Sequence, residues 1–298
     1  MDNIRYYILL AILILQLIML LIYINSRIDI LNTSTDHTVY DIPFNIKRKT
    51  NNTDTVISGV PLVIYQSWHI NKVPLNMRET IYKLLDMNPE FDYYLYSDEK
   101  SRDFISANYS EEVLTAFDTL KPGAYKSDLW RYCILYKTGG VYLDIKYFSI
   151  FPIVEMIKND PIIFVRDMHL ECSFGVPTGI YNAFMVSPPK CKIFINCINE
   201  IVENTKFKLY KSGSLDVTGP CLVSRMMKKY DDEVKYENKL YRRLNYKFTR
   251  IGLSFETIWY KNRKAFIVYN RYRAEQKAFQ KTEHYGKLWD EKNIYNIS

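Results

Sequence analysis

The sequence predicts an α/β protein, in which a sheet containing parallel strands is covered by helices. Two observations support this class. Short apolar runs alternate along the chain with segments of helical period, and Pro, Gly and Asn residues separate them. The chain has 298 residues with 48% hydrophobic content, which is enough for one full-sized core or two small ones.

The first predicted unit is a strand followed by a helix. The stretch "PLVIYQSW" at 61–68 is an apolar run that ends in polar and aromatic residues, as a buried parallel strand does. "MRETIYKLLDMN" at 77–88 repeats its apolar residues at helical spacing, and Pro89 ends it. "FDYYLYSDE" at 91–99 predicts a second strand that finishes at Asp98, with a helix beginning near residue 101.

The third predicted unit is a helix followed by a short central strand. "AYKSDLWRYCILYK" at 124–137 places Asp128 and Arg131 three residues apart on one face, and Gly139-Gly140 ends the helix. The strand 141–143 follows, with Asp144 at its carboxyl edge. Ligands of open α/β sheets bind outside the carboxyl ends of strands, so a site is expected there, with Trp68 and Asp98 at neighbouring ends.

The N-terminal region predicts a membrane anchor. No charge occurs from Tyr6 to Asn25, a length that matches about 30 Å of bilayer, and no small-residue cleavage site follows. We expect a head at 1–5, a transmembrane helix at 6–25, a polar stem at 26–58 and a catalytic domain at 59–298. The expected location is a single-pass type II protein of a Golgi/ER-like membrane or an equivalent host or viral membrane.

Charge and cysteine content narrow the function classes. The formal net charge of +7 suits an anionic ligand, but no nucleic-acid-binding motif accompanies the basic residues, so nucleic acid is not an expected partner. The five cysteines show no zinc-ribbon or redox spacing. One or two disulfides remain possible, and the sequence does not select their pairing.

Three motifs, in order, resemble the glycosyltransferases of the DXD sugar-binding family, which includes yeast-type initiating α-1,6-mannosyltransferases and inositol-phosphoceramide mannosyltransferases. They are "VPLVIYQSWHINKVP", "NPEFDYYLYSDE" and "AYKSDLWRYCILYKTGGVYLDIK". The close similarity covers about 60–150. The later segments "YNAFMVSPPK", "VTGP" and "HYGKLW" match the family more loosely.

The resemblance implies a GT-A-type, Rossmann-like mixed sheet flanked by helices, and a retaining glycosyltransferase. It implies a donor such as GDP-mannose or a UDP-hexose, a glycan or glycolipid acceptor, and a divalent cation, Mn²⁺ or Mg²⁺. The residues carried over are a catalytic group (Asp128, Arg131, Asp144, Lys146), a donor-binding group (Gln66, Trp68, Asp98, with Asp128 and Asp144 shared) and metal ligands (Asp144, His284). Asn182 and Asp167 are further candidates facing the sugar or the acceptor.

One departure from the family pattern is Lys146, which stands where the second DXD acid is expected. Extended alternation would put its side chain on the same side as Asp144, but a protonated lysine cannot ligate a metal. In one interpretation the metal stays, held by Asp144, the diphosphate, water and His284. In the other, Lys146 replaces its charge. We expect the first. The alternative function is a catalytically inactive carbohydrate-binding protein of the same fold.

Overall fold

A computed structural model describes residues 2–31, 38–50, 54–167, 170, 172, 179–234, 242–249, 255–280 and 282–296. The described strands are β1 (Val39–Asp41), β2 (Asn45–Ile46), β3 (Val56–Ile57), β4 (Val60–Pro61), β5 (Val63–Ser67), β6 (Lys72–Pro74), β7 (Asp92–Tyr96), β8 (Gly140–Leu143), β9 (Tyr147–Ser149), β10 (Ile163–Asp167), β11 (Gly179–Ser187), β12 (Arg242–Thr249), β13 (Phe255–Tyr260) and β14 (Arg263–Val268). The described helices are α1 (Asp2–Leu31), α2 (Leu75–Met87), α3 (Asp98–Asn108), α4 (Glu111–Thr119), α5 (Gly123–Thr138), α6 (Ile153–Ile157), α7 (Lys192–Lys206), α8 (Pro220–Val234), α9 (Tyr272–Phe279) and α10 (Tyr285–Asp290).

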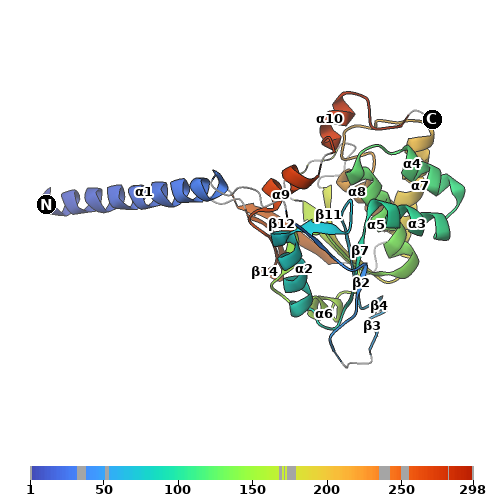
Figure 1. Cartoon of the computed structure of the whole chain (residues 1–298), viewed down its shortest axis with the longest axis horizontal. Helices are drawn as coiled ribbons and strands as arrows, with labels where there is room; N and C mark the ends of the chain where they lie inside the picture. The colour runs from blue at the N-terminus through green and yellow to red at the C-terminus, as the bar shows by residue number, and fades with distance from the viewer. Residues whose placement is uncertain are drawn as a thin grey trace.

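The centre of the fold is a mixed ten-stranded sheet with the order β2-β7-β5-β8-β11-β10-β12-β13-β14-β9 (Figure 1). Strand β5 pairs in parallel with β7 and β8, while β11 pairs antiparallel with β8 and β10. The parallel part is joined through helices, as the alternation of strand and helix patterns predicts. The α/β class and the mixed sheet are therefore confirmed.

Helices cover both faces of the sheet, and each face has its own core. Along β5, Ile64 packs into the core shared with α2 and α6, and Tyr65 packs into the core shared with α3, α5 and α7. In β8, Val141 packs into the first of these cores and Tyr142 into the second. Burial on both faces explains why these strands read as continuous apolar runs rather than as alternating ones.

The predicted elements agree with the structure, apart from their ends. The run at 61–68 is divided, because Pro61 pairs with Val56 in the small β3–β4 hairpin before β5 begins. The helix expected near 101 begins at Asp98, because the side chain of Ser97 caps it by accepting from the backbone N–H of Lys100. Asp98 is thus the first residue of α3 and not the last of a strand.

Gly139 and Gly140 connect α5 to β8 with positive φ values of 67° and 106°. A Cβ on Gly139 would lie 2.6 Å from the backbone nitrogen of Pro189. Both the backbone conformation and the packing therefore require glycine at 139. This turn brings the end of β8, and with it Asp144, back alongside α5.

The N-terminal region departs from the expected organisation. Helix α1 carries exposed apolar side chains from Tyr6 to Leu21, yet within the described part of the chain no helix reaches the length and apolar content needed to cross a membrane. The span expected at 6–25 is therefore not supported. The segment expected as a stem, 26–58, contributes β1 and β2, which pair with β6 and β7. Ile42 is buried in the core.

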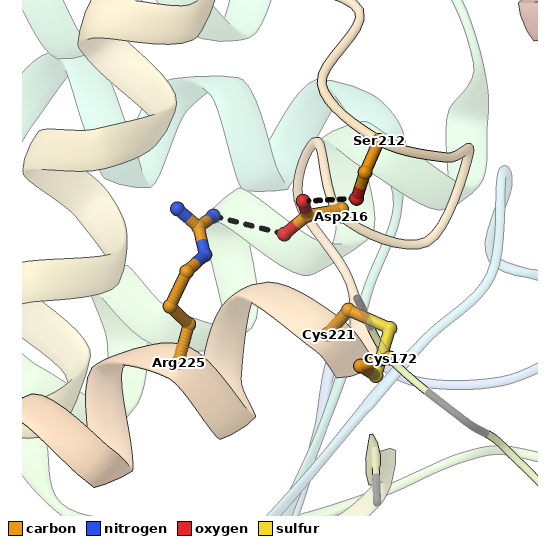
Figure 2. Close-up of a disulfide and its surroundings, with 5 residues drawn as sticks. All are labelled: Cys172, Ser212, Asp216, Cys221 and Arg225. Carbon is orange, nitrogen blue, oxygen red and sulfur yellow. Dashed lines mark hydrogen bonds and ion pairs between the residues drawn. A yellow bond between two sulfur atoms is a disulfide. The ribbon is translucent and has the colours of Figure 1, made fainter. Parts of the chain in front are cut away.

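A disulfide joins Cys172 to Cys221 at the start of α8 (Figure 2). Beside it, Asp216 accepts from the hydroxyl of Ser212 at 2.8 Å and pairs with Arg225 at 2.9 Å. The "VTGP" turn at 217–220 lies between Asp216 and this cystine. The disulfide and the ion pair therefore fix both ends of the turn.

Candidate functional site

Six charged side chains form one continuous row of alternating sign at the carboxyl edge of β8. They come from α5, from the turn between β8 and β9, from β13 and from α9. In order they are Asp128, Arg131, Asp144, Lys146, Glu256 and Arg273. Successive N–O distances are 3.4, 3.7, 3.2, 3.5 and 2.9 Å. The sequence predicted the first four members.

Arg131 holds the α5 side of this row in place. Its guanidinium donates to the backbone oxygen of Asn182 at 2.7 Å and to the hydroxyl of Ser127 at 3.0 Å, and it lies over the ring of Tyr142 at 4.3 Å. Its side chain is 8% exposed. Arg131 is thus a buried bridge between two carboxylates rather than a surface ion-pair partner, and it ties α5 to β8 and β11.

Asp128 is the most enclosed acid of the row. It accepts from the amide nitrogen of Asn182 at 3.0 Å and from the hydroxyl of Thr218 at 2.8 Å. Burial raises the pKa of Asp128 above its ordinary value, although Arg131 and both hydrogen bonds oppose the rise. Asn182 also donates to the hydroxyl of Tyr132 at 2.6 Å. The two looser sequence matches, around 182 and 218, therefore meet at Asp128.

Asp144 and Lys146 lie in a tight turn and not in an extended strand. The backbone N–H of Tyr147 donates to the carbonyl oxygen of Asp144 at 3.0 Å, which closes a four-residue turn. The two side chains meet as expected, but the reason is the turn and not strand alternation. Burial would raise the pKa of Asp144, but Lys146 and Arg131 outweigh it and hold that pKa below its ordinary value.

Lys146 is enclosed by acids and aromatic rings. Its Nζ lies 5.1 Å from the ring centre of Tyr181, 5.4 Å from that of Tyr147 and 5.9 Å from that of Tyr272. Burial would lower the pKa of this ammonium, but Asp144 is the first of several groups that together raise it above its usual value. Lys146 is therefore a fixed positive charge over the whole physiological range.

Sequence reasoning missed Glu256 and Arg273. Burial would raise the pKa of Glu256, but Lys146 and Arg273 lower it, and the hydroxyl of Tyr181 donates to its Oε2 at 3.2 Å. One signal was available. In "FETIWY" the glutamate alternates with Ile258 and Tyr260, which are both buried, so a carboxylate stands on an otherwise apolar strand face.

The three residues expected near the nucleotide occupy different environments. Gln66 is fully buried; it donates to the backbone oxygen of Asp144 at 3.3 Å and accepts from the hydroxyl of Tyr93 at 2.9 Å. Gln66 therefore supports the backbone at Asp144 through a hydrogen bond from the core. Trp68 lies at the end of β5 with its ring N–H buried and without a hydrogen-bond partner among the described residues. Burial raises the pKa of Asp98, and Lys126 partly offsets it.

His284 and Asp167 lie on elements other than those that carry the charged row. His284 caps α10: its Nδ1 accepts from the backbone N–H of Gly286 at 3.1 Å, and the side chain is exposed. Asp167 is the last residue of β10, and its carbonyl accepts from Leu170. Among the described residues, His284 makes no hydrogen bond or ion pair with Asp144.

The residues at Asp144 do not fit the divalent cation that the family resemblance implies. Oδ1 of Asp144 accepts from the hydroxyl of Tyr142 at 2.8 Å, and Oδ2 faces Lys146 at 3.2 Å. A hard cation needs about six oxygen ligands, whereas here an ammonium fills the space beside the carboxylate. Within the described ranges no group of three His, Cys, Asp or Glu side chains is placed to hold a metal. The expected pair of Asp144 and His284 is not assembled as a metal site.

The family described as "Glycosyltransferase sugar-binding region containing DXD motif" matches residues 74–163. Inositol phosphoceramide mannosyltransferase 3 of Schizosaccharomyces pombe is 30% identical over 43% of this chain and 32% of its own. A mannosyl phosphorylinositol ceramide synthase of Saccharomyces cerevisiae is 27% identical over 72% of this chain and 54% of its own. The initiation-specific alpha-1,6-mannosyltransferase of Candida albicans is 31% identical over 35% of this chain and 28% of its own.

These matches confirm the resemblance inferred from the three sequence motifs. The matched segments span between 28% and 54% of the length of these curated relatives. Among solved structures, a glycosyltransferase named PaToxG is similar with a TM-score of 0.45 and 15% identity, over 59% of this chain and 72% of that one. The matched region 74–163 includes Asp98, Asp128, Arg131, Asp144 and Lys146.

Proposed function

We propose that the chain transfers a hexose from a nucleotide sugar to a glycan or glycolipid, because residues 74–163 match the sugar-binding region of the DXD-motif glycosyltransferases. The observation that carries the proposal is the row of alternating charges at the end of β8, in which Arg131 and Lys146 are buried. The acids Asp128 and Asp144 and the base Arg131 all lie in the matched region, and side chains from β11 and the 217–220 turn support them.

Glycosyl transfer demands such a site because the donor's diphosphate gains negative charge as its bond to the sugar breaks. Fixed positive groups stabilise that charge best when they are already oriented before the reaction. Arg131 and Lys146 meet this condition, since each is buried and held by neighbours on more than one element.

We assign the side chains as follows. Asp128 accepts hydrogen bonds from hydroxyl groups of the donor sugar. Arg131 positions Asp128 and Asp144, and Lys146 faces the leaving phosphate. Among the described residues, the buried ring N–H of Trp68, at the neighbouring strand end, has no hydrogen-bond partner, and we assign it to the nucleotide. The buried amide oxygen of Asn182 likewise has no partner within the described part of the chain, and we assign it to a sugar hydroxyl.

We propose that configuration is retained through a front-face substitution. The bond between the anomeric carbon and the phosphate oxygen breaks, the acceptor oxygen bonds to that carbon on the same face, and the acceptor proton passes to the leaving phosphate. The carboxylates of Asp128, Asp144 and Glu256 are each paired with a cation. None of the three stands out among the described residues as a free nucleophile, which favours front-face substitution over a covalent glycosyl-enzyme step.

Mannose is the favoured sugar, with GDP-mannose as the donor and a UDP-hexose as the alternative, because the relatives are named mannosyltransferases. The relatives named for inositol phosphoceramide favour a glycolipid acceptor. The mixed sheet with helices on both faces agrees with a GT-A-type domain.

We also propose that the chain works at a membrane of the secretory route or of an equivalent host or viral compartment, with its body on the oxidising side as a type II protein. The exposed apolar residues of α1 and the Cys172–Cys221 disulfide favour this location. Carbonate extraction and alkylation of the expressed chain, with and without reductant, test both features.

The central test is hydrolysis of a panel of sugar nucleotides by the full chain. GDP-mannose should release nucleotide, and Asp144→Asn should lower the rate by at least about 100-fold, since it removes a charge from the row at nearly constant volume. Asp118→Asn is the matched control, because Asp118 is an exposed acid that pairs with Arg102. No turnover with any donor, combined with tight glycan binding, would instead support a non-catalytic carbohydrate-binding protein.

A further inference from the structure

The row of six side chains contains as many acids as bases. Asp128, Asp144 and Glu256 are balanced by Arg131, Lys146 and Arg273, so the row is neutral. In a DXD site the second acid and its divalent cation together carry one positive charge. Lys146 alone carries the same charge. The lysine therefore replaces both partners at once without altering the charge that a diphosphate meets.

From this equivalence, and resting on the proposed function, we infer that the site holds the donor diphosphate without a divalent cation, and that Lys146 supplies the positive charge. The ammonium already occupies the space between two carboxylates, 3.2 Å from Asp144 and 3.5 Å from Glu256. A cation entering there would meet a like charge at contact distance, and it would have to displace the lysine before either acid could ligate it.

The remaining carboxylate oxygens of the row are also engaged. The Oε1 of Glu256 pairs with Arg273 at 2.9 Å, and the oxygens of Asp128 accept from Asn182 and Thr218. A divalent cation would need one or two of these carboxylate oxygens beside the diphosphate and water, and each oxygen so recruited would have to give up an ion pair or a hydrogen bond that it now makes.

The surroundings of Lys146 fix its position. Three tyrosine rings, those of Tyr147, Tyr181 and Tyr272, surround the ammonium, and the side chain is 9% exposed. An ammonium carries three donors. Two of them face Asp144 and Glu256, so one is left for a phosphate oxygen.

The experiment measures binding of GDP and UDP to the full chain by titration calorimetry, in EDTA and in Mn²⁺, together with Mn²⁺ binding to the free protein by electron paramagnetic resonance. For the unaltered chain we expect nucleotide affinities that differ by less than about twofold between the two conditions, and no bound Mn²⁺ at millimolar concentration. Lys146→Met should weaken nucleotide binding by at least about tenfold in both conditions.

Lys146→Asp restores the second acid of the DXD motif. It should create a Mn²⁺ signal and make nucleotide binding depend on the metal by at least about tenfold. Lys158→Met, on an exposed lysine at the end of α6, is the matched control and should behave as the unaltered chain. Thermal melts check that each variant is folded, and the comparison of EDTA with Mn²⁺ in the unaltered chain stands without any variant.

The inference is overturned if the unaltered chain loses at least tenfold in nucleotide affinity with EDTA and regains it with Mn²⁺. Failure of the proposed function has a different signature, namely no binding of either nucleotide in either condition, and this outcome would overturn the inference as well.

Discussion

Replacing Arg131 by methionine tests the role of the buried part of the charged row most directly. The guanidinium lies between Asp128 and Asp144 at 3.4 and 3.7 Å and donates to the carbonyl of Asn182 at 2.7 Å. Methionine keeps most of the volume but leaves two acids without this partner. Breaking a buried ion pair by removing one member costs about 3–5 kcal/mol, which corresponds to a fall in melting temperature of roughly 6–20 °C for a domain of this size.

The same variant should acquire a distinctive pH dependence. Burial already raises the pKa of Asp128, and without Arg131 that pKa rises further. A carboxyl whose folded pKa exceeds its unfolded value stabilises the fold at low pH, and this stability is lost as pH rises from the unfolded value towards the folded one. We therefore expect the Arg131→Met variant to be least stable near neutral pH and to recover part of the loss on acidification towards pH ~5.

Urea unfolding, monitored by circular dichroism at several pH values, measures both the loss of stability and its pH dependence. Arg102→Met is the matched control, because Arg102 forms a pair with Asp118 at 2.7 Å that is largely exposed to solvent. Its removal should leave the midpoint nearly unchanged. A loss for Arg131→Met no larger than that of the control, or one independent of pH, would show that the row is not a buried ion-pair network.

Three further perturbations address the turn, the β5 edge and the disulfide. Gly139→Ala should destabilise the chain by about 1–3 kcal/mol in urea unfolding, because of the positive φ and the clash described above, whereas Gly213→Ala, which meets no atom within 4 Å, should cost far less. Burial lowers the pKa of His69, so stability should fall as pH drops below about 6.5 and level off below the folded pKa; His69→Gln should flatten that slope in melts at pH 5 to 8. Cys172→Ser should cost about 2–4 kcal/mol by removing the bond to Cys221 across 49 residues, and an equal melting temperature for the unaltered chain with and without reductant would contradict this.

The central strands and helices could be predicted from the sequence because their signals are local. The apolar run of β5, the helical period of α2 and the glycine pair after α5 each depend on neighbours in the chain. The ends were less accurate. Ser97 starts α3 earlier than the apolar pattern indicates, because a cap is a hydrogen bond rather than a hydrophobic signal.

The residues of the site likewise fall into those with a local signal in the sequence and those without one. Asp128, Arg131, Asp144 and Lys146 lie within 19 residues of one another in the chain, so a helix and the adjoining strand end predict that they meet. Glu256 reaches Lys146 from a strand more than 100 residues later. No local rule determines which strand lies next to Lys146. The alternation of Glu256 with the buried residues Ile258 and Tyr260 was the signal in the sequence that Glu256 lies on an apolar strand face.

Lys146 shows how a departure from a motif gains meaning from its surroundings. In the sequence it stands only as a base at a position where an acid is expected, which led us to expect a site that keeps its metal and left a site without one as the alternative. In the fold it lies between Asp144 and Glu256, and Arg273 balances the second acid. A lysine that merely disabled a metal site would need neither Glu256 nor Arg273. The presence of both partners shows that the ammonium is accommodated as a structural charge, and this favours a site whose electrostatics are built around it.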